Sequence, residues 1–280
     1  MLFLFLYMAK ANDPIGIFDS GIGGLTVAAA IHRLLPHENL IYFGDTAHFP
    51  YGDKSPGLID AYGAGITQYL LSRNCKMIVI ACNTASAYAY KTVKTLAGSK
   101  ALVINVIDPA AEAIAALYPN SKVGVIATRG TIASGIYPRK IKKRSKHTEV
   151  TSLATPLLAP MIEEGFFNNK ISRTIIQSYL EKKSLKHIEA IILGCTHYPL
   201  IRKEVEEYYK GKVKVFDSAE MVAQSVKENL TQQKLLRKTA KSSLEFYVSD
   251  FTESFSSSAR NFFPGEIELK KLDIWKSNEI

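Results

Sequence analysis

An α/β fold of two similar flavodoxin-like lobes, each built on a largely parallel sheet, is predicted for this 280-residue chain. Two observations predict it. Short apolar runs alternate with longer amphipathic segments, and the second half of the chain echoes the first. Short continuous apolar runs are typical of strands that are buried on both faces of a parallel sheet. Strands that alternate with helices in this way are joined by right-handed crossovers.

The apolar runs predict strands at residues 15–18, 40–43, 77–80, 102–107, 122–126, 190–193 and 213–216. The amphipathic segments predict helices at 24–35, 56–72, 84–96, 169–182, 199–209 and 219–230. We expect the first lobe to hold residues 1–103 together with 213–280, and the second to hold residues 104–212. The chain would then cross twice between the lobes, so the crossing would act as a hinge.

Two pairs of segments show this similarity between the halves of the chain. IGIFDSGIGG from residue 15 resembles VGVIATRGTI from residue 123, and MIVIACNTAS from residue 77 resembles AIILGCTHYP from residue 190. The separation within the two pairs is nearly the same. Each lobe therefore carries one cysteine just after a buried strand, Cys82 in the first and Cys195 in the second.

Composition narrows the class of protein. Hydrophobic residues make up 47% of the chain and charged residues 22%, which is typical of a globular protein. The net charge of +9 favours anionic partners without choosing among them. The three cysteines are too few for a disulfide framework, and the absence of Cys-x-x-Cys and His-x-x-x-His argues against a structural zinc site.

The apolar start of the chain is too short for a membrane span and lacks the features of a signal peptide. We interpret residues 1–7 as a frayed start or as a misassigned initiator upstream of Met8. A cytoplasmic protein with no membrane association is expected. The basic run at 138–147 lacks interleaved aromatic residues, so we interpret it as a solvated helix face and expect no nucleic-acid partner.

Ligands of open parallel sheets bind at the carboxyl ends of the strands. The polar residues at such ends are Asp19, Ser20, Cys82, Asn83, Thr84, Thr128, Cys195, Thr196 and His197. Two facing lobes would place two thiols on opposite walls of one cleft, so we expect the active site there. This arrangement suits a reaction that needs one group on each face of a substrate carbon.

The two cysteines differ in their sequence surroundings. Cys82 is expected to begin a helix, whose dipole and free amides favour the thiolate and lower the pKa of a cysteine. Cys195 is followed by His197, which could accept or tune its proton. The third cysteine, Cys75, has no polar neighbours of this kind and is interpreted as a packing residue.

Other chemistries fit the sequence less well. A Cys–His pair also serves acyl transfer, but a hydrolase has no use for a second thiol. The glycine-rich turn at 21–24 fails the dinucleotide fingerprint, and we expect its amides to approach a small anion instead. No Walker-type sequence and no site for a Schiff-base lysine can be located.

Taken together, these segments resemble the glutamate racemase family of the aspartate/glutamate racemase superfamily. The matching stretches are FDSGIGGLT from residue 18, YFGDTAHFPYG from 42, ACNTAS from 81, VGVIATRGT from 123, PMIE from 160, GCTHYP from 194 and FDS from 216. Departures are small: His48 stands where the family commonly has Arg, and Ala127 where Gly is usual.

The resemblance implies cofactor-independent racemisation of glutamate for peptidoglycan, with one thiol removing the α-proton and the other returning a proton. By match, Cys82 acts on one enantiomer, assisted by Asp19, and Cys195 on the other, assisted by His197 and Glu163. The implied substrate-binding residues are Ser20, Tyr51, Gly52, Asn83, Thr84, Thr128, Thr131 and Thr196. Neither a metal nor a cofactor is implied, and a homodimer is expected. The alternatives are an aspartate racemase, a Cys–His hydrolase and a two-lobed amino-acid-binding protein.

Overall fold

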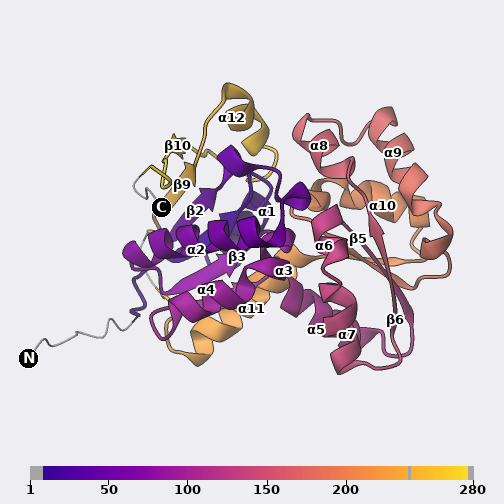
Figure 1. The fold of residues 1–280 in the computed structure, drawn as a ribbon, viewed down its shortest axis with the longest axis horizontal. Coiled ribbons are helices and arrows are strands. Elements are labelled where there is room, and N and C mark those ends of the chain that lie inside the picture. The colour runs from indigo at the N-terminus through magenta and orange to yellow at the C-terminus, as the bar shows by residue number, and fades with distance from the viewer. Residues whose placement is uncertain (1–8, 239–240, 277–280) are drawn as a thin grey trace, which may run out of the picture.

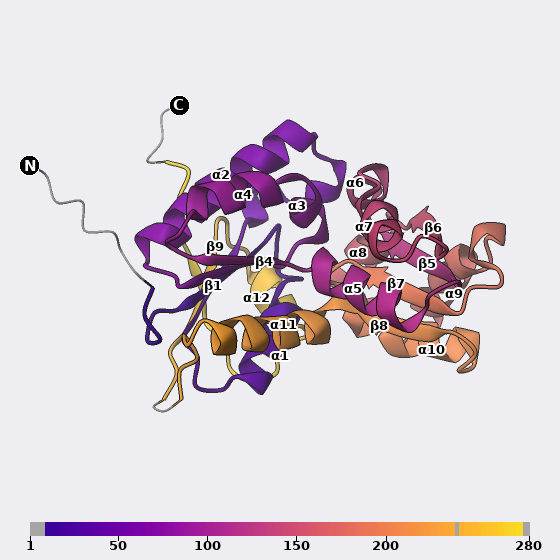
Figure 2. The same ribbon diagram turned by 90° about the horizontal axis from the view of Figure 1, so that it is seen from below.

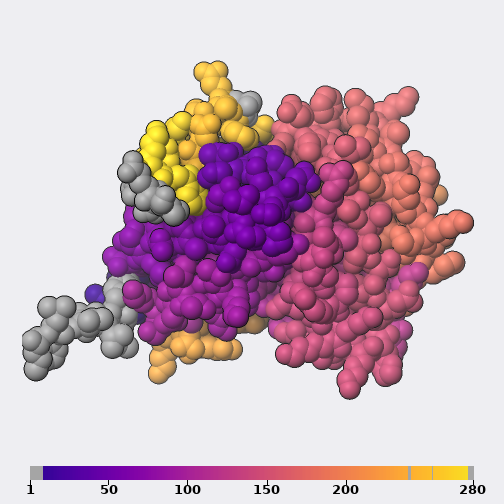
Figure 3. Space-filling model, viewed as in Figure 1, coloured from indigo at the N-terminus to yellow at the C-terminus, as the bar shows by residue number. Residues whose placement is uncertain are grey.

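Two parallel sheets organise the computed structural model, which describes residues 9–238 and 241–276 (Figure 1). Every strand pair recorded within these residues is parallel. The predicted α/β fold class is therefore confirmed. On the face shown in Figure 3, the amino-terminal residues and the middle of the chain meet along a common boundary.

The first sheet has six strands in the order β10-β9-β2-β1-β3-β4. Its strands are β1 (Ile15–Asp19), β2 (Leu40–Gly44), β3 (Met77–Ile80), β4 (Leu102–Asn105), β9 (Leu244–Val248) and β10 (Leu269–Lys271). The helices of this lobe are α1 (Leu25–Leu34), α2 (Pro56–Ser72), α3 (Asn83–Tyr88), α4 (Tyr90–Ala97) and α12 (Glu253–Ala259), with the 3-10 turns η1 (Thr46–His48) and η2 (Tyr51–Asp53). Figure 2 shows α2, α3 and α4 on one side of this sheet and α1 on the other.

The second sheet has four strands in the order β6-β5-β7-β8. Its strands are β5 (Lys122–Ala127), β6 (Glu149–Ala154), β7 (Ala190–Gly194) and β8 (Lys214–Asp217). The remaining elements are α5 (Ile107–Leu117), α6 (Arg129–Ala133), α7 (Ile136–Arg144), α8 (Leu158–Glu163), α9 (Lys170–Leu180), η3 (Lys183–Leu185), η4 (Tyr198–Ile201), α10 (Arg202–Tyr209) and α11 (Ser218–Gln232). The order β2-β1-β3-β4 recurs here as β6-β5-β7-β8, so both sheets share the flavodoxin-like arrangement.

Both boundaries of the predicted division differ from the sheet membership. The division placed residues from 104 onward in the second lobe, whereas Ile104 and Asn105 of β4 pair with β3 in the first sheet. The division placed residues from 213 onward in the first lobe, whereas β8 at Lys214–Asp217 pairs with β7 in the second sheet. Its apolar residues continue that sheet, with Val215 beside Ile191 and Phe216 beside Ile192. The chain therefore leaves the second sheet after Asp217. Helix α11 follows, and it packs against α1 of the first lobe and α5 of the second.

The hydrophobic core follows from the alternation of side chains along the strands. In β1, Ile17 belongs to a large cluster that continues through Val125 and Ile192 of the second lobe. Its neighbour Phe18 points to the opposite face, into a smaller cluster with Ile66 of α2. Full burial of each such side chain stabilises the fold by about 1.5–3 kcal/mol. The larger cluster contains residues of both lobes, so the two lobes share one hydrophobic core.

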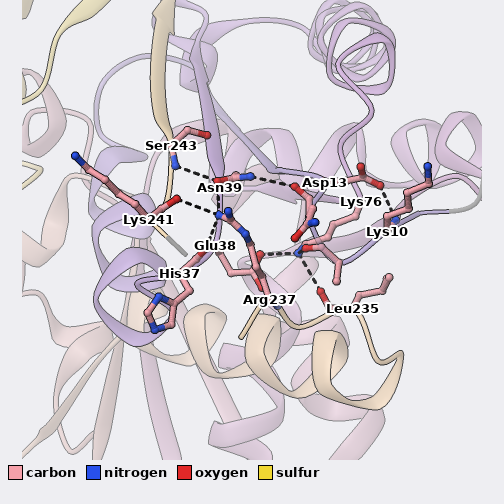
Figure 4. Close-up of polar contacts among 12 residues, drawn as sticks. Lys10, Asp13, His37, Glu38, Asn39, Lys76, Leu235, Arg237, Lys241 and Ser243 are labelled. Atoms are coloured by element: carbon pink, nitrogen blue, oxygen red, sulfur yellow. Dashed lines mark hydrogen bonds and ion pairs between the residues drawn. The ribbon is translucent and has the colours of Figure 1, made fainter. Parts of the chain in front are cut away.

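A buried ion pair between Lys76 and Glu38 lies at the amino-terminal ends of strands β2 and β3 (Figure 4). The ammonium of Lys76 donates to Glu38 Oε2 at 2.5 Å and to the carbonyl oxygen of Leu235 at 3.0 Å. Glu38 Oε1 accepts the backbone N–H of Arg237 at 2.8 Å. Both charged side chains are fully buried. The segment that follows α11 is thereby tied to the strands of the first sheet.

Three predicted elements differ from the structure. The helix predicted at 84–96 is divided into α3 and α4, the strand predicted at 102–107 ends at Asn105 with α5 beginning two residues later, and the helix predicted at 199–209 is divided into η4 and α10. The side chain of Asn105 causes the second change, because its Oδ1 accepts the N–H groups of Ile107 and Asp108. Among the described residues, none of the helices has the length and apolar character needed to cross a membrane.

Candidate active site

A small cavity of about 60 Å³ lies between the lobes. Ten predicted site residues line it: Ser20, Tyr51, Gly52, Cys82, Asn83, Thr84, Thr128, Cys195, Thr196 and His197. Three others lie behind its wall, namely Asp19, Glu163 and Thr131, and each is linked to a lining residue by a hydrogen bond. The structure therefore brings the predicted residues together around one cavity.

The strand order explains why these residues meet. In each sheet the strand order changes direction once, between β1 and β3 in the first sheet and between β5 and β7 in the second. Such switch points form crevices at the carboxyl ends of the strands. Asp19 ends β1, and Cys82 follows β3. Thr128 follows β5, and Cys195 follows β7. Each lobe thus presents its own switch point to the cavity.

Cys82 is the N-cap residue of α3, as the sequence predicts. Its sulfur accepts the backbone N–H of Ala85 at 3.4 Å, and its thiol donates to Ser20 Oγ at 3.7 Å. The expected low pKa is wrong. Burial, together with the nearby charge of Asp19, raises the pKa of Cys82 to about 12, because these effects outweigh the two hydrogen bonds. The neutral thiol is therefore the favoured form of Cys82 in the empty site.

Asp19 is fully buried where β1 meets the glycine-rich turn. Its Oδ2 accepts the backbone N–H groups of Gly24 at 2.9 Å and Gly21 at 3.3 Å. The turn was expected to hold a small anion, and the anion that it holds is this carboxylate. Burial raises the pKa of Asp19, although the charge of His197 and the backbone donors oppose the rise.

Cys195 belongs to a chain of three side chains. Its sulfur lies 3.6 Å from His197 Nδ1, and His197 Nε2 lies 2.7 Å from Glu163 Oε1. Burial lowers the pKa of His197, but hydrogen bonds to Cys195 and Glu163 overcome this and raise it well above its usual value of 6.5. An imidazolium between the thiol and the carboxylate is the favoured form, and it stabilises negative charge on the sulfur of Cys195.

Hydroxyl and amide groups complete the wall. Thr84 Oγ1 lies 2.9 Å from Thr128 Oγ1 and 3.2 Å from Thr131 Oγ1, which links the two lobes. Asn83 Oδ1 accepts the hydroxyl of Tyr137 at 2.7 Å, whereas its buried Nδ2 has no hydrogen-bond partner within the described chain. An unpaired buried donor costs about 1–3 kcal/mol. A ligand acceptor in the cavity would remove that cost.

Seven residues that were not predicted from the sequence complete the lining. Phe49, Pro50, Asp53, Arg129, Pro156, Ala159 and Pro160 also line the cavity. Arg129 forms an ion pair with Asp53 at 3.3 Å across the mouth between the lobes. It directly follows Thr128, so its position next to a strand end was the signal available in the sequence. Tyr51 was predicted to bind substrate, but its hydroxyl donates to Asp45 Oδ2 at 2.6 Å.

Metal ligands of the usual kind are not clustered in the described part of the chain, where no group of three or more His, Cys, Asp and Glu side chains has a suitable arrangement. The groups of this site that can take part in chemistry are its two thiols, the imidazole, the carboxylates and the neutral donors. Thiols and imidazole have unperturbed pKa values of about 8.5 and 6.5, which suit general acid–base catalysis near neutral pH.

Comparisons with known proteins agree with this picture. A sequence model of the Asp/Glu/Hydantoin racemase family matches residues 24–226. A glutamate racemase from Chlorobaculum parvum is 42% identical over 256 residues, which cover 91% of this chain and 94% of that protein.

Solved structures extend the likeness to the whole fold. A glutamate racemase from Francisella tularensis, in complex with D-glutamate, has a TM-score of 0.89 and 38% identity, with 95% of this chain and 99% of that chain covered. A glutamate racemase from Thermus thermophilus, in complex with β-chloro-D-alanine, has a TM-score of 0.85 and 36% identity, with coverage of 94% and 98%.

Fold and site together define a two-lobed α/β enzyme with a thiol from each lobe in one cavity. The chain belongs to the Asp/Glu/hydantoin racemase family. It is an amino-acid racemase, and thus an isomerase.

Proposed function

We propose that this protein interconverts L-glutamate and D-glutamate by two-thiol proton transfer at Cα, without a cofactor, and supplies D-glutamate for peptidoglycan. One observation carries the proposal: Cys82 and Cys195 come from different lobes and line the same cavity. Inversion at carbon requires that a proton leave one face and another arrive on the opposite face. A thiol on each wall meets that requirement.

The two thiols have different surroundings, and from these we assign which thiol starts as the base and which as the acid. We assign Cys195 as the starting base, because its sulfur lies 3.6 Å from His197 Nδ1, and Glu163 contacts the other ring nitrogen of that histidine at 2.7 Å. Cys82 begins as the acid, because burial favours its neutral form. The Cys195 thiolate removes the α-proton from one enantiomer, and the Cys82 thiol then delivers its own proton to the opposite face.

The reverse direction requires a thiolate at Cys82. Asp19 lies close enough for its negative charge to raise the pKa of Cys82. A proton on Asp19 removes that charge, and the raised pKa of this buried carboxyl makes the protonated form accessible. Asp19 thus assists Cys82 by controlling the charge beside it.

Neutral donors would bind the substrate and stabilise charge that develops at the α-carboxylate. The free Nδ2 of Asn83 and the hydroxyls of Ser20, Thr84 and Thr128 line the cavity, and Thr131 supports them from behind. The backbone of Tyr51 and Gly52 and the hydroxyl of Thr196 add to this set. Donors arranged in advance in a dry site stabilise a carbanion without adding a cation that would neutralise the base.

Several points support glutamate and the absence of a cofactor. The relative from Francisella tularensis was solved with D-glutamate, and the curated relative is named for glutamate. Lysine is absent from the residues that line the cavity in the described chain, so a Schiff base has no partner there. We infer a cytoplasmic protein, and the family resemblance implies a homodimer.

Circular dichroism of amino-acid solutions tests the proposal. The purified protein, dialysed against buffer without pyridoxal phosphate, should drive both L-glutamate and D-glutamate to the racemic mixture. The same protein should leave L-aspartate largely unchanged. If aspartate were racemised faster than glutamate, aspartate would be the substrate. No change with either amino acid would reject the proposal, and an acyl-enzyme trapped on one cysteine would revive the hydrolase.

A further inference from the structure

A buried carboxylate outside the catalytic set, Asp45, lies at the start of the segment that forms one wall of the cavity. We call residues 46–53 the cavity loop, because Phe49 to Asp53 line the cavity. We propose that Asp45 is a positioning residue through which Ser249 and Trp275, near the end of the chain, hold the cavity loop in its substrate-binding arrangement. The substrate named below rests on the proposed function.

Asp45 is fully buried and accepts hydrogen bonds from four side chains. Two come from the cavity loop: Tyr51 Oη donates to Oδ2 at 2.6 Å, and His48 Nδ1 lies 2.9 Å from Oδ2 and 3.0 Å from Oδ1. Two come from the carboxyl-terminal part of the chain: Ser249 Oγ donates to Oδ1 at 2.9 Å, and Trp275 Nε1 donates to it at 3.1 Å. The carboxylate of Asp45 therefore joins the cavity loop to the carboxyl-terminal part of the chain.

The carboxyl-terminal segment is itself fixed on the first lobe. Ser249 follows β9, its N–H donates to the carbonyl of Gly44 at 2.9 Å, and its Oγ accepts the N–H of Ala47 at 2.9 Å. The indole of Trp275 packs edge-on against Tyr62 of α2, with ring centroids 5.6 Å apart, and against His48 at 5.0 Å. These contacts hold Ser249 and Trp275 against the first lobe beside Asp45.

The cavity loop transmits this arrangement to the second lobe. A Cβ on Gly52 would lie 2.9 Å from Thr128 Cβ, so the loop backbone and α6 touch without room for a side chain. Asp53 forms its ion pair with Arg129 of α6. A small shift of the loop would therefore change both the cavity wall and the contact between the lobes.

This network should govern binding more than chemistry. The thiols, Asp19 and His197 are attached to β1, β3 and β7, and the loop is attached to β2. Loss of an uncharged donor to a buried carboxylate loosens the loop but leaves the reacting groups in place. We therefore expect KM to rise while kcat is retained.

Steady-state kinetics of glutamate racemisation tests the inference with Trp275→Phe, Ser249→Ala and Asp45→Asn. The first two should each raise KM about three- to tenfold, as expected for the loss of one hydrogen bond to a charged group, with kcat within about twofold of wild type. Trp275→Phe should raise KM no further in the Asp45→Asn background, because contacts that act through one residue are not additive. Lys270→Ala is the control, since this exposed side chain of β10 pairs only with Glu268 among the ion pairs recorded for it.

The outcomes separate the two proposals. Wild-type KM values in both single variants would overturn the positioning role, as would a fall in kcat at constant KM, which indicates loss of active protein. Equal effects of Trp275→Phe in the wild-type and Asp45→Asn backgrounds would also overturn it. Absence of turnover in wild type would instead reject the proposed function, and the named substrate with it.

Discussion

Individual residues make the two thiols chemically unequal. Cys82 is neutralised by burial, whereas Cys195 faces an imidazole that Glu163 holds at 2.7 Å. The same element of sequence, a cysteine after a buried strand, thus has different neighbours in the two lobes. The pKa of His197 is the property through which this difference can be measured.

Glu163→Gln should shift the pH profile of kcat/KM. The carboxylate raises the pKa of His197, so its removal lets the imidazole lose its proton at a lower pH. Activity that depends on the Cys195 thiolate with a protonated His197 should then decline at lower pH than in wild type. Kinetics in both directions between pH 6 and 10 would measure the shift.

The neighbouring exposed carboxylate provides the control. Glu164→Gln removes an equal charge one residue away and should leave the profile unchanged. An identical profile for Glu163→Gln and wild type would contradict the role given to this residue.

The glycine-rich turn shows why one small residue is required. A Cβ on Gly23 would lie 2.5 Å from His197 Nδ1 and 2.6 Å from Thr196 Oγ1. Gly23→Ala should therefore displace the imidazole and lower kcat by about 10- to 100-fold, since displacements near 1 Å have effects of that order. Gly57→Ala is a matched control, because its Cβ would meet no atom within 4 Å. Full activity of Gly23→Ala would show that the turn can move away.

At the scale of secondary-structure elements, the buried ion pair of Lys76 and Glu38 attaches the segment after α11 to the first sheet. Lys76→Met should lower the free energy of unfolding by about 3–5 kcal/mol, because it leaves Glu38 charged, buried and without its cation. Lys76→Met combined with Glu38→Leu should recover most of that loss. Urea denaturation measures both values.

An exposed pair of the same type sets the baseline. Lys122 lies 3.6 Å from Glu149 with both side chains partly or largely exposed, and Lys122→Met should change stability by about 1 kcal/mol or less. A similarly small effect of Lys76→Met would mean that the buried pair is not important for stability.

The elements that could be predicted were those with an undisturbed hydrophobic pattern. The buried strands β1, β3 and β7 read as continuous apolar runs. The edge strand β6 did not, because it is half exposed and mixes Glu149, Thr151 and Ser152 with apolar residues. Helix α5 was hidden because the apolar run of β4 continues into it and only the cap at Asn105 separates them.

The candidate site divides in the same way. Cys82, Cys195 and His197 could be proposed because local motifs carry them, and Glu163 came only from the family resemblance. Asp45 and Trp275 could not be proposed, since their meeting depends on a tertiary contact between residues far apart in the chain. The pKa of Cys82 was wrong in direction because burial, which the sequence does not report, outweighs the helix terminus.

For the whole molecule, two lobes with the same strand order share a core at their base and enclose the cavity between their strand ends. Helix α11 contacts both lobes, which places the return crossing beside the shared core (Figure 2). The site is therefore assembled only when the lobes are docked. Its ionisation should contribute to the stability of the whole fold.

Stability should accordingly depend on pH through His197. Its folded-state pKa is raised above 6.5, so the stabilisation is complete below about pH 6.5 and is lost as the pH rises through the raised value. We expect the free energy of unfolding to decline over this alkaline range in wild type and to decline less in His197→Asn. Urea titrations at several pH values measure it, and an equal decline in the two proteins would contradict the assignment.

The central claim, that two thiols act on opposite faces of one carbon, is tested most directly by racemisation in deuterium oxide. At early conversion, the product enantiomer should carry deuterium at Cα while the remaining substrate stays unlabelled, because a different thiol returns the proton. Cys82→Ser and Cys195→Ser should each abolish racemisation, with slow exchange of one enantiomer at most. Equal labelling of substrate and product from the start, or sustained turnover by Cys82→Ser, would contradict the claim.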